Sequence, residues 1–178
     1  MFAEIQPLVI NYNVIIHVGA NNLSRGSPVD QVLTKYQTLV QSIWSTNPKA
    51  QVILSGVIPR AQNNFPHAIL GTDWLQDYNN RASELNSRLT KIASTHHQLT
   101  YIGHSNFVCS GVLQRHQLST DGLHLSFKGK SSVVDDMEKA ILTLRLTQRK
   151  YVTPPPTTEY QTIWDSQTTS VTSTTSDT

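Results

Sequence analysis

The sequence predicts an α/β fold in which a parallel sheet is covered by helices on both faces. Three short, continuous apolar runs have the composition of buried strands, at residues 13–19, 51–59 and 99–108. A longer segment with helical spacing of its apolar residues follows each run, at 27–48, 72–97 and 126–150. Strands buried on both faces that alternate with amphipathic helices are typical of this fold class.

The first of these helices has the clearest signals at both ends. Ser27 suits the N-cap and Pro28 the first turn, while Asn47 followed by Pro48 ends the helix. One face is apolar at helical spacing and is expected to point inward. It comprises Val29, Val32, Leu33, Tyr36, Leu39, Val40 and Ile43.

Length and composition indicate one globular domain, residues 1–150, followed by a tail. The chain has 178 residues, of which 38% are hydrophobic. Residues 151–178 are dominated by Thr, Ser and Pro and contain too little apolar surface to offset the entropy of ordering, so we expect a disordered tail. No segment is apolar and long enough to span a membrane, and we find no signal peptide, so the compartment is left open.

Charge and cysteine content narrow the partner and cofactor classes. The net charge is only +2, and the basic residues Arg145, Arg149 and Lys150 suit the C-terminal end of a helix. No aromatic residues interleave with them, so we expect no nucleic-acid partner. Cys109 is the single cysteine, which excludes an internal disulfide and a cysteine-based zinc site. No motif requires a metal or an organic cofactor.

Gly19 and Asn21 lie directly after the first predicted strand, in "VIIHVGANN". Ligands of such sheets bind beyond the carboxyl ends of the strands, which is where these two residues are expected. The Asn21 amide could donate a hydrogen bond to a developing oxyanion. An asparagine after a glycine is also an ordinary turn residue, and the motif alone does not separate the two interpretations.

Asp121 and His124 lie three residues apart in "STDGLHLSFKGK", between the third strand and the last helix. Ser126 is the expected N-cap of that helix. A short turn can point both side chains at one place. A histidine that acts as a general base needs its second ring nitrogen held by an acceptor, and Asp121 or a backbone carbonyl could supply that acceptor. On its own, the pair also fits a polar turn with an exposed histidine.

Together and in this order, the two motifs resemble the SGNH, or GDSL-type, hydrolase family over about residues 10–145. "VIIHVGANN" matches the family's third block and "DGLHLSFKG" its fifth. The resemblance implies a three-layer α/β/α sandwich of flavodoxin-like type and hydrolysis of esters. It implies Asn21 as an oxyanion-hole donor, His124 as the general base, Asp121 as its orienting acid and Gly19 as the residue that permits the turn.

The sequence departs from the family pattern at two places. Asn22 stands where the third block usually has an aspartate. The family's nucleophilic serine lies in a Gly-Asp-Ser block well upstream, whereas residues 1–13 contain no serine. We therefore expect an N-terminally truncated fold that is inactive as it stands. Neither Ser24, expected to bond the local backbone, nor Ser55, within the second strand, is expected to replace the nucleophile.

The remaining histidines are not assigned to the site. His17 lies within the first strand and is expected to pack in the core, and His104 has no partner that the sequence identifies. Removing a neighbouring strand would also leave the first strand as an apolar edge. Residues 1–10 could partly cover that edge, another chain could cover it, or the sequence is a fragment, which is the alternative we favour. Self-association through the edge is therefore one further expectation.

Two other function classes remain open. A non-catalytic binding or scaffold module on the same fold would explain the missing serine, although it gives no reason to keep Asn21, Asp121 and His124 together. A nucleotide-binding flavodoxin-like domain would need a phosphate loop after the first strand. "GANNLSRGS" lacks the glycine spacing and the phosphate-reaching lysine of such a loop.

Overall fold

A parallel sheet of three strands forms the centre of the fold. The computed structural model describes residues 12–65 and 71–148. In the order β1-β2-β3, the strands are β1 (Asn13–Ile16), β2 (Gln51–Ser55) and β3 (Leu99–Ile102). Both pairs are parallel, with Val14 of β1 opposite Val52 of β2 and Leu54 of β2 opposite Tyr101 of β3. The carboxyl ends of all three strands therefore meet at one edge of the sheet.

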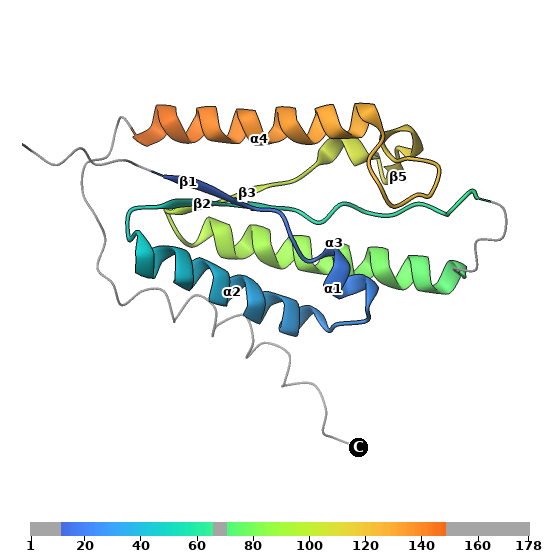
Figure 1. Cartoon of the computed structure of the whole chain (residues 1–178), viewed down its shortest axis with the longest axis horizontal. Helices are drawn as coiled ribbons and strands as arrows, with labels where there is room; N and C mark the ends of the chain where they lie inside the picture. The colour runs from blue at the N-terminus through green and yellow to red at the C-terminus, as the bar shows by residue number, and fades with distance from the viewer. Residues whose placement is uncertain (1–11, 66–70, 149–178) are drawn as a thin grey trace, which may run out of the picture.

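Helices cover both faces of this sheet and make a three-layer α/β/α sandwich (Figure 1). α2 (Val29–Thr46) and α3 (Thr72–Ser94) lie on one face, with the short α1 (Ala20–Ser24) at its end. α4 (Phe127–Gln148) lies on the other face. The predicted fold class is therefore confirmed.

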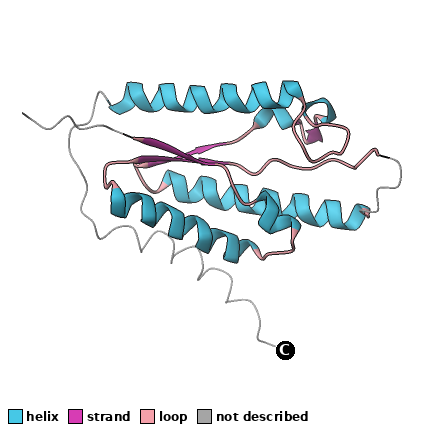
Figure 2. Cartoon of the chain, in the orientation of Figure 1, coloured by secondary structure: helices cyan, strands magenta, loops and turns pink. Residues whose placement is uncertain are grey.

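The α3–α4 connection also carries small elements, drawn beside the start of α4 in Figure 2. They are the 3-10 turns η1 (Ser105–Phe107) and η2 (Arg115–Gln117) and the hairpin strands β4 (Val108–Cys109) and β5 (Val112–Leu113).

The core lies on both sides of the sheet. The larger cluster joins the sheet to α2 and α3, and Tyr36, Tyr78 and Leu85 are fully buried in it. The smaller one joins Ile53 of β2 to Ala140 and Leu144 of α4. Because β2 is buried from both sides, its sequence is apolar at successive positions rather than alternating.

Several local expectations are confirmed and others are wrong. The Ser126 Oγ accepts a hydrogen bond from the Gly129 amide at 3.1 Å, which is the expected N-cap of α4. Pro28, not Ser27, occupies the N-cap position of α2, because the helix begins one residue later than the polar signal suggested. Leu39 is 43% exposed, so the inward face of α2 is narrower than predicted. The tail, residues 151–178, lies outside the described residues.

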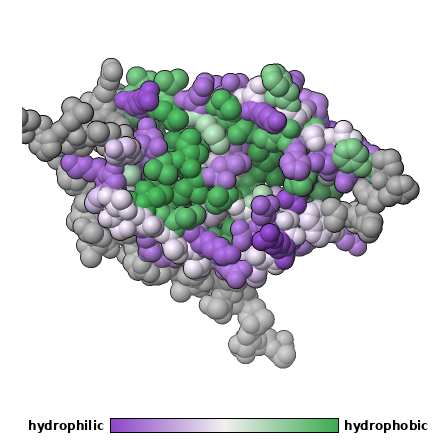
Figure 3. All heavy atoms as spheres, in the orientation of Figure 1, coloured by the Kyte–Doolittle hydropathy of each residue, from purple (hydrophilic) through white to green (hydrophobic). Residues whose placement is uncertain are grey.

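β1 pairs with β2 on one side, and no other strand of the described residues pairs with it. In Figure 3, apolar side chains gather on the face that lies between α4 and α2.

No helix among residues 12–65 and 71–148 has the length and apolarity needed to cross a membrane.

Candidate active site

Gly19 turns the chain sharply at the end of β1. Its φ is 101°, a backbone conformation that strains residues with a side chain, and an added Cβ would lie 3.3 Å from the Cγ2 atom of Val57. The Gly19 carbonyl accepts the Leu23 amide at 3.0 Å and so starts α1. This turn leaves Asn21 exposed in the first turn of α1. The Ser24 hydroxyl donates to the Asn21 carbonyl at 3.0 Å, the local bond expected for it.

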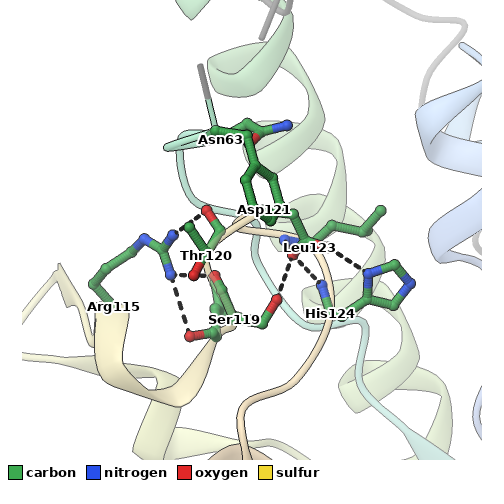
Figure 4. A network of polar contacts seen from close by, with 9 residues as sticks. Asn63, Arg115, Ser119, Thr120, Asp121, Leu123 and His124 are labelled. Carbon is green, nitrogen blue, oxygen red and sulfur yellow. Dashed lines mark hydrogen bonds and ion pairs between the residues drawn. The ribbon is translucent and has the colours of Figure 1, made fainter. Parts of the chain in front are cut away.

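Asp121 and His124 form a hydrogen-bonded pair in the turn before α4 (Figure 4). The Asp121 Oδ2 lies 2.5 Å from the His124 Nδ1. The other carboxylate oxygen, Oδ1, accepts from the Ser119 hydroxyl at 2.8 Å and from the Leu123 and His124 amides at 2.8 and 2.9 Å. The hydrogen bond to His124 lowers the pKa of Asp121, and burial opposes this effect. The two amides and the Ser119 hydroxyl each lower the pKa further by a smaller amount.

An ionised Asp121 accepts hydrogen bonds only, so the His124 Nδ1 carries the proton. The Nε2 atom then has a free lone pair, and the side chain is 76% exposed. This is the tautomer that a general base requires, with its basic nitrogen open to a reactant.

The turn that carries this pair is tied to its surroundings by backbone contacts (Figure 4). The Arg115 guanidinium donates to the carbonyls of Leu118, Ser119 and Thr120 at 3.2, 2.5 and 2.7 Å. The Gly122 carbonyl accepts the Ala61 amide at 2.9 Å. A Cβ on Gly122 would lie 2.3 Å from the Ala61 carbonyl oxygen, so this close approach requires glycine.

A cleft of about 400 Å³ lies beside the ends of β1 and β2. Gly19 and Asn21 line one part of it, and Leu123 and Leu125, the two neighbours of His124, line another. Both sequence motifs therefore border one cleft, although Asp121 and His124 themselves are not among its lining residues. Among the described residues, no hydrogen bond joins Asn21 to the Asp121–His124 pair.

Arg60 supplies a positive charge beside this cleft. Its guanidinium lies 4.3 Å from the ring centre of Tyr78 and 5.6 Å from that of Trp74, and Arg60 is 8% exposed. Burial raises the pKa of Tyr78, and the nearby Arg60 charge opposes that rise. Arg60 lines both the main cleft and a smaller hollow of about 90 Å³ that Asp121 also borders. Within the described residues, no group of three or more His, Cys, Asp or Glu side chains could hold a metal ion.

Sequence reasoning missed a second set of polar residues beside the cleft. His17 is exposed and lines the cleft, so the expectation that it packs in the core is wrong. His104 has two partners, the Ser55 hydroxyl at 2.8 Å and the Asp136 carboxylate at 2.9 Å. The predicted strands were too long and placed His17, Ser55 and His104 inside them. The observed strands end at Ile16, Ser55 and Ile102, so the three side chains lie at or just beyond the carboxyl ends of parallel strands, where side chains meet.

The three-layer α/β/α sandwich places its polar motifs beyond the carboxyl ends of the strands, where ligands of such folds bind. The chain belongs to the GDSL-like lipase/acylhydrolase family, whose model matches residues 3–131. It is 30% identical over 138 residues to the platelet-activating factor acetylhydrolase IB subunit alpha1 of Bos taurus. That match includes 76% of this chain and 53% of the bovine protein, so the chain spans about half the length of this relative.

Solved structures show the same fold. A GDSL-like lipase from Bacteroides thetaiotaomicron superposes with a TM-score of 0.59 at 20% identity, over 74% of this chain and 62% of that one. A proposed acylhydrolase from Bacteroides fragilis gives a TM-score of 0.60 at 20% identity, with the same two coverages.

Proposed function

We propose that this chain carries the acid–base and oxyanion-binding part of a serine-dependent ester hydrolase. The observation that carries the proposal is the Asp121–His124 pair, in which one carboxylate oxygen holds the His124 Nδ1 and the other is fixed by three further donors. Such an arrangement orients an imidazole so that Nε2 can exchange a proton repeatedly. The nucleophilic serine comes from residues that this chain does not contain.

In this mechanism the His124 Nε2 takes the proton of the serine hydroxyl as its oxygen attacks the ester carbonyl. The Asn21 amide donates a hydrogen bond to the oxyanion that forms. The imidazolium of His124 then returns the proton to the leaving alcohol, and an acyl-serine remains. Water, activated by His124 in the same way, attacks the acyl-serine and releases the acid. Asp121 stays ionised throughout and stabilises the imidazolium.

The position of the cleft supports this assignment. It borders Asn21 on α1 and the leucines on either side of His124, so a bound ester could contact both motifs. None of these steps requires a cofactor or a metal. The partner is an ester substrate.

The alternative is a binding module on the same fold. The engagement of nearby serines supports it: Ser24 bonds the Asn21 carbonyl, and Ser55 is fully buried, so neither is free to attack a substrate. Saturable binding of an ester without turnover, in a protein that carries all the family's blocks, would favour this alternative.

Hydrolysis of p-nitrophenyl acetate by the 178-residue chain tests the missing nucleophile. We expect no rate above that of the His124→Ala variant and no covalent labelling by a fluorophosphonate, which reacts with activated serines. Hydrolysis that His124→Ala abolishes would contradict the proposal, and mass spectrometry of the labelled peptide would then identify the serine.

A further inference from the structure

A chain of hydrogen bonds runs from the cleft, past the ends of the strands, to α4. The His17 Nδ1 lies 2.8 Å from the Ser55 Oγ, and the same Oγ lies 2.8 Å from the His104 Nε2. The His104 Nδ1 lies 2.9 Å from the Asp136 Oδ2. These four residues come from the ends of β1, β2 and β3 and from α4, so the parallel register and the packing of α4 bring them together.

Burial decreases toward one end of this chain. Ser55 has no exposed surface, and the His104 and Asp136 side chains are 3% and 15% exposed. His17 is exposed and lines the cleft. The series of hydrogen bonds is therefore most buried at its centre, at Ser55 and His104, and it reaches the cleft at His17.

With Asp136 ionised and His104 neutral, each hydrogen bond in this series has a single direction. An ionised Asp136 can only accept, so the His104 Nδ1 donates to it. A neutral His104 then accepts at Nε2 from the Ser55 hydroxyl, and the Ser55 oxygen accepts from the His17 Nδ1. The Nε2 of His17 is left with a free lone pair.

Ser55, His104 and Asp136 have the bonding order of a catalytic triad, but the site does not suit a nucleophile. The Ser55 hydroxyl is fully buried and is engaged with two histidines. The ring centres of Phe107 and His17 lie 6.2 and 5.8 Å from that of His104, each in an edge-on arrangement. An ester has no path to the Ser55 oxygen, whereas a proton can move along the chain.

We propose that His17 is a second proton acceptor of the cleft, linked to Asp136 by a proton relay through Ser55 and His104. The Nε2 lone pair of His17 accepts the proton of a hydroxyl group in the cleft. The Nδ1 proton of His17 moves to the Ser55 oxygen, and the Ser55 hydroxyl proton moves to the His104 Nε2. The positive charge ends on His104, beside the Asp136 carboxylate, and no heavy-atom bond changes.

This assignment goes beyond the ester hydrolysis proposed above, because it depends on His17 and not on a nucleophile or on His124. Imidazole tautomers can be read in the chain as it exists by ¹⁵N-detected NMR with assigned histidine side chains. We expect both His17 and His104 in the Nδ1–H form, with a pyridine-type Nε2. An Nε2–H tautomer at His17 in the unaltered protein would overturn the proposal.

Ser55→Ala breaks the relay at its buried centre with a small change of volume. We expect His17 to lose the Nδ1–H form and adopt the Nε2–H form, while His104 keeps its bond to Asp136. Ser132→Ala is the matched control, since Ser132 is also buried and hydrogen-bonded, to the Gln117 Oε1 at 3.2 Å, but lies outside the relay. An unchanged His17 tautomer in folded Ser55→Ala would contradict the relay.

His104→Phe gives an independent test if Ser55→Ala fails to fold. Phenylalanine keeps an aromatic ring beside Phe107 but removes the acceptor of the Ser55 hydroxyl, which is then free to donate to His17. We again expect the Nε2–H form at His17, and retention of the Nδ1–H form would overturn the proposal.

Titration with benzyl alcohol distinguishes an alcohol from water as the hydroxyl group whose proton His17 accepts in the cleft. A saturable shift of the His17 Nε2 resonance would support an alcohol, such as the leaving group of an ester. No shift, with the Nδ1–H tautomer intact, would support water as the proton donor.

Discussion

At the scale of single residues, the two oxygens of Asp121 have different tasks. Oδ1 accepts three hydrogen bonds from its own turn, and Oδ2 faces only His124. An amide in place of the carboxylate would put its oxygen where the three donors point. Its NH₂ group would then face the His124 Nδ1, which must become an acceptor.

We therefore predict that Asp121→Asn moves the His124 proton from Nδ1 to Nε2, which ¹⁵N NMR of the chain can detect. In a protein that contains the nucleophile, the wrong tautomer should lower kcat by about 10²–10⁴-fold. Asp73→Asn, at an exposed carboxylate in the first turn of α3, is the matched control. An unchanged His124 tautomer in Asp121→Asn would refute the orienting role.

His96 is buried away from the cleft and sensitive to pH. It is 4% exposed, and its ring lies 4.7 Å from that of Trp44. Burial, with a smaller contribution from the nearby His97, lowers its pKa to about 4. Between this value and the ordinary pKa of about 6.5, the unfolded chain binds a proton at His96 that the folded chain does not.

The free energy of unfolding should therefore fall as the pH is lowered from 6.5 to 4, with about 2 kcal/mol of the loss due to His96. Urea unfolding across this range measures the slope. His96→Phe, which keeps a ring against Trp44, should flatten the slope even if it lowers stability at neutral pH. His116→Phe, at an exposed histidine, should leave it unchanged. An equal slope in His96→Phe would exclude His96 as the cause.

At the scale of elements, β1 has one edge that no other described strand covers. It pairs only with β2 among the described strands, and apolar side chains gather on the face between α2 and α4 (Figure 3). Unpaired strand edges recruit further strands. We propose that the chain by itself associates through this edge.

Val14→Lys places a charge within β1 and should shift the chain toward monomer in sedimentation velocity. Leu39→Lys is the control, because Leu39 is 43% exposed and lies on α2, outside the sheet. Equal sedimentation of the two variants, both folded by circular dichroism, would contradict association through β1.

The sequence predicted features that depend on local patterns. The α3 helix begins at Thr72, where the predicted segment 72–97 begins, and Ser126 caps α4. The Asp121–His124 bond follows from a spacing of three residues. The relay from His17 to Asp136 joins residues more than one hundred positions apart, and only the strand register and the docking of α4 bring them together. That juxtaposition is a property of the tertiary structure, which a single sequence does not display.

At the scale of the whole molecule, the chain spans 53% of the bovine relative and 62% of the Bacteroides hydrolases. In our account, the part it contains holds the base, its orienting acid and an oxyanion donor. We propose that the nucleophile lies outside these 178 residues. We propose that the part of the hydrolase that this chain contains becomes catalytically competent once a nucleophilic serine is supplied.

The most direct test is hydrolysis of p-nitrophenyl acetate by this chain joined to an N-terminal segment that carries a family Gly-Asp-Ser block. Circular dichroism establishes first that the extended protein and its variants are folded. The account predicts hydrolysis that His124→Ala lowers by at least about 10³-fold and that His116→Ala, at an exposed histidine outside the cleft, leaves unchanged. A folded extended protein that hydrolyses the ester equally well without His124, or not at all with it, would contradict the account.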